Sequence, residues 1–175
     1  MMLEKENIRL RAVEPEDAEL MWNVESDSAQ WIQNGMSAPL SRQNILDYAL
    51  SYDADPMGAR QIRLIIEDKT NNEVVGIADI YDISPLHRHA FVGIYILPSK
   101  RRQGLGVKSL EILDDYAFKL LNINHLAAKI MAGNDASVAL FGKAGYACRG
   151  EIPAWFLCGN ESIPLMLYSK ILGNH

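Results

Sequence analysis

The chain has 175 residues, 49% of them hydrophobic, and a formal net charge of -5. This size suits a single domain over residues 1–175 with a substantial buried core. The acidic balance argues against a nucleic-acid partner. No apolar stretch reaches the roughly 18 residues that span a bilayer, and the charged N-terminus lacks an apolar signal segment, so we expect a cytoplasmic protein with no membrane partner.

The two cysteines, Cys148 and Cys158, indicate neither a zinc site nor a stable disulfide. No second Cys or His pair accompanies them at the spacing of zinc ligands. A disulfide between them is disfavoured in a reducing compartment. We therefore expect no metal ion in this protein.

The first third of the chain predicts one strand and two helices. Residues 7–13 alternate apolar and polar side chains, as a half-buried strand does. Residues 14–25 begin with acidic residues and a proline in the first turn, which favours a helix. A second helix begins at Ser41, which is a suitable cap. The stretches 26–41 and 52–59 have the small, polar composition of loops.

The remaining residues predict an antiparallel meander followed by alternating strands and helices. Residues 60–68 and 73–82 form a predicted hairpin, and a third strand over 90–97 ends before a proline. Further along we expect a helix over 106–122, a strand over 125–131, a helix over 134–146 and two closing strands, the last over 163–172. This order implies a mixed sheet with helices packed on it.

The sequence "PSKRRQGLGVKS", residues 98–109, predicts an anion site between a strand and a helix. A Walker loop has a glycine directly before its Lys-Ser pair, and Lys108 and Ser109 lack that glycine. A dinucleotide fingerprint would have its third glycine where Ser109 stands. Gly104 and Gly106 nevertheless leave the first amides of the helix accessible to an anion. A solvated basic turn is the alternative interpretation.

The pattern Arg101-x-x-Gly104-x-Gly106, with "GIYIL" before it and "NDASVALFGKAGY" after it, resembles the acetyl-CoA-binding core of the GNAT superfamily of N-acetyltransferases. The segments "DDYAFKLLNINHLAAKI" and "GKAGYACRGEIPAWFLCGN" resemble most the branch that contains ribosomal-protein N-terminal acetyltransferases and spermidine N-acetyltransferase. The resemblance implies an α/β (α+β) fold with a mixed, mostly antiparallel sheet, a splayed central pair of strands and flanking helices.

The resemblance also implies which residues bind the co-substrate, acetyl-CoA. The pantetheine arm would lie along the strand end and the pyrophosphate on the loop amides. The implied residues are Ile96, Leu97, Arg101, Arg102, Gln103, Gly104, Leu105, Gly106, Val107, Lys108, Asn134, Ser137 and Lys143. Asn134 and Ser137 are equally consistent with a helix cap and its neighbour.

The family's chemistry is direct transfer, in which an amine attacks the thioester carbon and a backbone amide near Leu97 stabilises the oxyanion. Phe141 stands where many relatives have a tyrosine as general acid, and Phe91 where many have a glutamate as base. His87 and Tyr146 are the candidates that remain for proton transfer. An ordinary loop histidine and a core tyrosine are the alternatives.

The expected reaction is acetyl-CoA-dependent N-acetylation of a primary amine, on a polyamine, another small molecule or a protein N-terminus. Asp79 and Asp82 are candidates to attract the cationic amine, or are solvated residues of a strand end. Trp31 lies in the segment that covers the acceptor side in this family, where core packing is the alternative. A non-catalytic acyl-CoA-binding module is the alternative function. The oligomeric state stays open between a monomer and a homo-oligomer.

Overall fold

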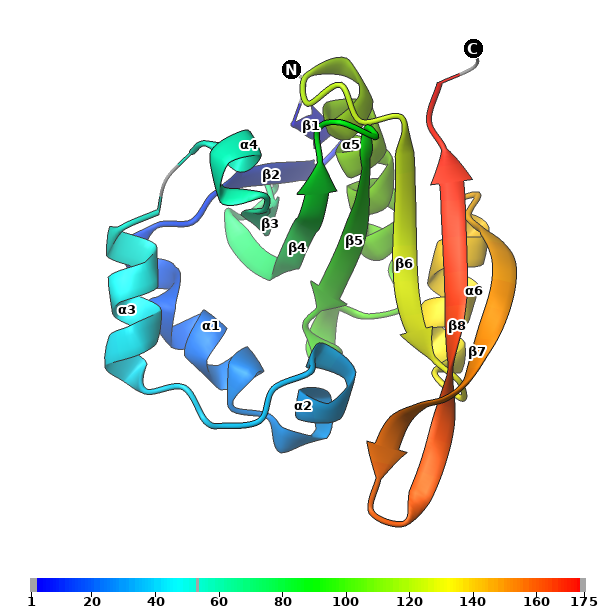
Figure 1. Cartoon of the computed structure of the whole chain (residues 1–175). Helices are drawn as coiled ribbons and strands as arrows, with labels where there is room; N and C mark the ends of the chain where they lie inside the picture. Colours follow the sequence, from blue (N-terminus) through cyan, green and yellow to red (C-terminus); the bar gives the residue numbers. More distant parts are fainter. Residues whose placement is uncertain (1–2, 53, 174–175) are drawn as a thin grey trace.

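The computed structural model describes residues 3–52 and 54–173, in which eight strands form one sheet in the order β1-β2-β3-β4-β5-β6-β8-β7 (Figure 1). The strands are β1 (Glu4–Lys5), β2 (Ile8–Ala12), β3 (Ile62–Asp68), β4 (Glu73–Ser84), β5 (His89–Ile96), β6 (His125–Met131), β7 (Ala147–Cys158) and β8 (Glu161–Ile171). The pairings are antiparallel except for that of β5 with β6. The structure thus confirms the mixed, mostly antiparallel sheet.

The central strands β5 and β6 pair over a short distance and then separate. Their parallel register contains three pairs, from His89 with His125 to Phe91 with Ala127. Beyond Phe91, β5 continues to pair with β4, and beyond Ala127, β6 continues to pair with β8. Figure 1 shows the two strands diverging toward their C-terminal ends. This is the splayed pair that the resemblance implies.

Helices cover both faces of the sheet. They are the short helix η1 (Pro15–Asp17), α1 (Ala18–Glu25), α2 (Ser28–Asn34), α3 (Arg42–Leu50), α4 (Pro56–Ala59), η2 (Pro98–Lys100), α5 (Leu105–Lys119) and α6 (Asp135–Lys143). One face packs on α5 and α6, and the other on α1 and α3. The two faces of the sheet are therefore covered by different helices.

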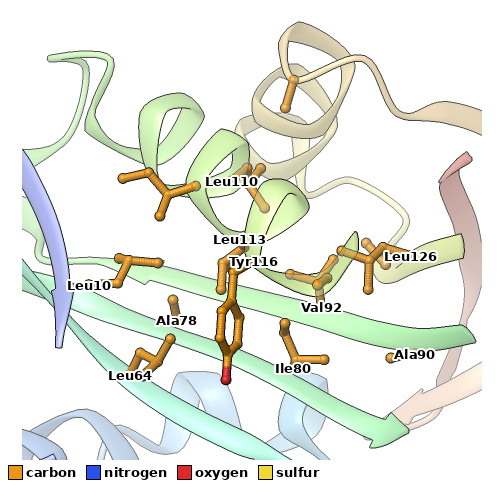
Figure 2. Packing of buried hydrophobic residues seen from close by; sticks show 14 of the residues in the cluster. Leu10, Leu64, Ala78, Ile80, Ala90, Val92, Leu110, Leu113, Tyr116 and Leu126 are labelled. Atoms are coloured by element: carbon orange, nitrogen blue, oxygen red, sulfur yellow. The ribbon is translucent and has the colours of Figure 1, made fainter. Parts of the chain in front are cut away.

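The larger core lies between α5 and the sheet. Leu110, Leu113 and Tyr116 recur on one face of α5 and are at most 5% exposed. They pack against inward-facing residues of the sheet, among them Leu64 and Ile80 (Figure 2). Burying a side chain of this kind stabilises the fold by roughly 1.5–3 kcal/mol. This packing fixes the start of α5 relative to the end of β5.

Three short elements differ from the predictions. The stretch 26–41, expected to be a loop, contains α2, and the stretch 52–59 contains α4. Asp55 caps α4 by accepting a hydrogen bond from the Gly58 amide at 3.0 Å, and a proline follows at the first helical position. The strand β1 was not predicted, because two residues carry no periodic pattern.

Candidate active site

A cavity of about 2120 Å³ lies where β5 and β6 separate. Its lining includes Val92 to Ile96 of β5 and residues 129–131 of β6. On one side of the sheet it is bounded by the N-terminus of α5 and by α6, and on the other by residues of α1, α2 and α3. The cavity thus connects the glycine loop to the opposite face of the sheet.

The loop between β5 and α5 has the backbone that close approach of an anion requires. Gly104 caps α5 with φ of 76°, in the left-handed region that favours glycine. A Cβ atom on Gly106 would lie 2.8 Å from Leu140 Cδ1 of α6, so glycine allows the two helices to approach here. The first amides of the 15-residue helix have no partner within the helix and carry the positive end of its dipole.

The basic side chains of the loop point in different directions. Arg101 and Arg102 line the cavity, and Arg101 Nε donates to the Ile96 carbonyl at 3.0 Å. Lys108 does not line it, because its Nζ lies 2.6 Å from Glu6 on the other side of α5. The prediction that Lys108 reaches a phosphate is therefore wrong for this structure. Helical spacing turns that position away from the loop.

Four further predicted cofactor residues line the cavity, and one does not. Leu105 and Val107 do so from α5, and Ser137 and Lys143 from α6. Gln103 is exposed outside the lining residues.

Asn134 both caps a helix and lines the cavity. Its Oδ1 accepts a hydrogen bond from the Ser137 amide at 3.2 Å, at the start of α6. The capping interpretation is thus correct, and it coexists with a place at the cavity wall. The side chain fixes where α6 begins relative to β6.

The strand register changes which backbone amide faces the cavity. The Leu97 N–H donates to the Val75 carbonyl at 2.9 Å, inside the β4–β5 pairing. Because bonded and non-bonded residues alternate in an antiparallel pair, Ile94 and Ile96 direct their N–H and C=O groups away from β4. Ile96 lines the cavity and Leu97 does not. The Leu97 amide is therefore occupied within the sheet, and the neighbouring amides that face the gap are those of Ile94 and Ile96.

His87 lies outside the cavity. It is exposed in the turn before β5, and its ring stacks on that of His89 with centroids 6.1 Å apart. The paired rungs of β5 and β6 stand between this turn and the point of separation. The prediction that His87 transfers a proton is wrong, because the histidine lies beyond the closed end of the strand pair.

Tyr146 is a core residue. It is 3% exposed, its hydroxyl donates to Asp114 Oδ1 at 2.7 Å, and its ring packs edge-on against Phe141. Burial, reinforced by the Asp114 carboxylate, raises the pKa of Tyr146. It does not line the cavity, so the prediction of Tyr146 as an acid there is wrong.

An ion network not predicted from the sequence lines the cavity on the α1 side. Arg63 donates to both oxygens of Asp79, at 2.8 and 3.0 Å, and to Glu25 Oε1 at 2.8 Å. Burial lowers the pKa of Arg63, but the two carboxylates raise it by more. Trp31, predicted for this side, lines the cavity and donates its indole N–H to the Glu25 carbonyl at 2.8 Å. Arg63 lies too far in sequence from Asp79 and Glu25 for a motif to reveal the ion network.

A second group of side chains surrounds the point of separation. Asp82, also a predicted acceptor residue, lines the cavity and pairs with Lys129 at 3.4 Å. Lys129 Nζ lies 4.0 Å from the ring centroid of Phe91, which stacks on Tyr81. With the ion network, this region of the cavity contains three carboxylates, those of Glu25, Asp79 and Asp82.

Two classes of site are absent from the part of the chain that the structure describes. Within residues 3–52 and 54–173, His, Cys, Asp and Glu side chains form no group of three or more that is placed to hold a metal ion. No helix in those ranges combines the length and hydropathy of a membrane span. Cys148 and Cys158 are free and exposed.

Relatives with known names cover nearly the whole chain. It is 22% identical to the spermidine N(1)-acetyltransferase of Escherichia coli K12, over 89% of this chain and 81% of that protein. It is 26% identical to a putative ribosomal N-acetyltransferase of Bacillus subtilis, over 95% of this chain and 92% of that protein. The spermidine N-acetyltransferase of Vibrio cholerae, solved with CoA and spermine, shares the fold with a TM-score of 0.80 and 20% identity, covering 95% and 96% of the two chains.

The family comparison agrees with the fold. The model of the acetyltransferase (GNAT) domain matches residues 7–147, which is most of the chain. The predicted activity and co-substrate are thereby confirmed: this is an N-acetyltransferase that uses acetyl-CoA. The chain belongs to the GNAT family of acetyltransferases.

Proposed function

We propose that the enzyme acetylates a primary amine of a small polycation such as a polyamine, as a single domain over residues 1–175. The observation that carries this proposal is the distribution of charge along the cavity: a basic loop at the donor end and three carboxylates, those of Glu25, Asp79 and Asp82, at the acceptor end. The names of two relatives, both spermidine acetyltransferases, support the same acceptor class. A cytoplasmic location without nucleic-acid or membrane partners fits this role.

On the donor side, the geometry supports an extended pantetheine arm along the separated edge of β5. The gap-facing groups of Ile94 and Ile96 are available there for strand-like pairing. Arg101 would exchange the Ile96 carbonyl for a phosphate, and the amides at the start of α5 would hold the pyrophosphate. Asn134, Ser137 and Lys143 form the opposite wall of this half.

On the acceptor side, an amine approaches from the face covered by α1 and α3. Glu25 and Asp79 hold its positive charges, and the neutral end of the amine attacks the thioester carbon. The gap-facing amides of β5 stabilise the oxyanion that forms. No covalent intermediate with the protein is required, since both substrates meet in one cavity.

A thiol-release assay across a panel of amines tests this proposal. We expect turnover with spermidine and spermine, and little with peptides bearing free N-termini. Glu25→Gln should raise KM for spermidine with a smaller effect on KM for acetyl-CoA. Glu19→Gln, on the same helix but outside the cavity lining, is the matched control.

Three results would change the proposal. Turnover of peptides alone would replace the polyamine by a protein N-terminus. Tight CoA binding without turnover of any amine would favour the non-catalytic module. An equal effect of the two glutamate variants would remove Glu25 from the acceptor site.

A homo-oligomer is part of the proposal, since a relative from Vibrio cholerae is dodecameric, and light scattering tests it.

A further inference from the structure

The cavity contains a phenol hydroxyl with no hydrogen-bond partner among the described residues. Tyr81, on β4, lines the cavity, and its ring stacks on Phe91 of β5 with centroids 5.8 Å apart. Lys129 Nζ lies 5.6 Å from the centroid of the same ring. A phenol near the reacting atoms is a proton donor at neutral pH.

The ring leans over the point where the sheet opens. Phe91 forms the last paired rung with β6, and Gly93 is the next residue of β5 on the same face. A Cβ atom on Gly93 would lie 3.7 Å from Tyr81 Cε1, the ring atom next to the carbon that bears the hydroxyl. The hydroxyl end of Tyr81 therefore lies over the first separated residues of β5, where the gap begins.

We propose that Tyr81 donates the proton to the thiolate that leaves acetyl-CoA. The inference rests on the proposed function and supplies the general acid that Phe141 cannot. As the nitrogen–carbon bond forms and the carbon–sulfur bond breaks, the phenolic proton passes to sulfur. The phenolate then takes the proton that the attacking nitrogen loses on becoming an amide. The products are the acetamide and free CoA thiol, and Tyr81 ends protonated.

The surroundings keep Tyr81 in the form that this step needs. Burial first, and then the carboxylates of Asp82 and Asp79, raise the pKa of Tyr81 to about 12. The phenol is therefore protonated throughout the physiological range. Lys129 Nζ, 5.6 Å from the ring centroid, favours the phenolate electrostatically while it exists.

Other tyrosines fit this role less well. Tyr95 lies at the loop end of β5, with the Arg101 guanidinium 5.6 Å from its ring centroid. Tyr48, on α3, packs edge-on against Tyr52, whose hydroxyl is bonded to the Arg63 carbonyl. Both Tyr95 and Tyr48 line the cavity, so they are the competitors that an experiment must exclude.

The test is Tyr81→Phe, which keeps the ring stacked on Phe91 and removes only the hydroxyl. With spermidine as acceptor, we expect kcat to fall roughly 10²-fold, the lower end for loss of a general acid. The KM for acetyl-CoA and the melting temperature should stay close to those of the wild type. The solvent deuterium isotope effect on kcat should shrink, which a purely structural role would not cause. Tyr168→Phe, the same change outside the cavity lining, is the matched control.

Each outcome of this test bears on the inference. An unchanged kcat or isotope effect in Tyr81→Phe would overturn it, as would an equal loss in the Tyr168 control. The same losses in Tyr95→Phe or Tyr48→Phe, with Tyr81→Phe active, would move the role to that residue. A wild-type enzyme without turnover on any amine would overturn the proposed function, whereas equal turnover in wild type and variant would overturn this inference alone.

Discussion

Arg63→Met should destabilise the fold by leaving two carboxylates without their shared cation. Arg63 makes three charge-assisted hydrogen bonds, at 2.8 and 3.0 Å to Asp79 and at 2.8 Å to Glu25. Removing one partner of a buried ion pair costs about 3–5 kcal/mol. We expect about 3 kcal/mol, the lower end of that range, because 23% of the Arg63 side chain and 28% of that of Asp79 stay exposed.

The assay is urea unfolding followed by circular dichroism, with a thermal scan beside it. A loss of this size lowers the melting temperature by roughly 6–12 °C in a domain of this length. If unpaired charge is the cause, the triple variant Arg63→Met, Glu25→Gln, Asp79→Asn should recover much of the loss. A single variant within about 0.5 kcal/mol of wild type, or a triple variant no more stable than the single one, would refute this reasoning.

Three further predictions concern the cofactor loop, the core tyrosine and pH. Gly104→Glu should weaken acetyl-CoA binding in calorimetry. Nothing lies within 4 Å of the added Cβ, so the main cost to stability is the left-handed backbone, about 1–2 kcal/mol, and the protein should stay folded. Unchanged affinity would contradict the loop assignment. Tyr146→Phe should lower the unfolding free energy by about 1–3 kcal/mol, because the Asp114 carboxylate loses a hydrogen-bond donor. The kcat should stay unchanged, and a loss of kcat without a loss of stability would restore a catalytic role for Tyr146. Burial lowers the pKa of His125, so the unfolded chain binds the proton more tightly and stability should fall from pH 7 to pH 5. His125→Gln should flatten that part of a urea-midpoint profile, and an equally steep profile would argue against the shift.

Periodicity predicted the elements whose faces are buried. The apolar stripe of 106–122 reflects the packing of α5 on the sheet. The apolar runs in 60–68 and 73–82 form strands with buried residues on both faces of the sheet. The splayed pair of strands followed from the resemblance alone, because no local pattern records where two strands part. The helices α2 and α4 were missed because their composition is that of loops, although Asp55 and its following proline are start signals.

The sequence predicted the glycine loop that precedes α5, but not the directions of the side chains around it. The left-handed backbone of Gly104 depends on local sequence, whereas the contact that requires Gly106 is made with Leu140 of α6. The direction of the Lys108 side chain depends on the phase of the helix. The strand register decides that the Leu97 amide bonds to β4 and does not face the gap. The direction of the strands decides that His87 lies far from the gap. Arg63 and Glu25 are separated by 38 positions and meet only through tertiary packing.

The three-rung contact between β5 and β6 means that the two halves of the sheet share few hydrogen bonds with each other. A substrate that pairs with the separated edge of β5 would supply some of the missing bonds. The donor is then a structural part of the sheet while it is bound. Saturating it at 100 times its dissociation constant adds about 2.7 kcal/mol to stability. We expect that gain as slower amide hydrogen exchange in β5 and β6, the strands that meet at the gap.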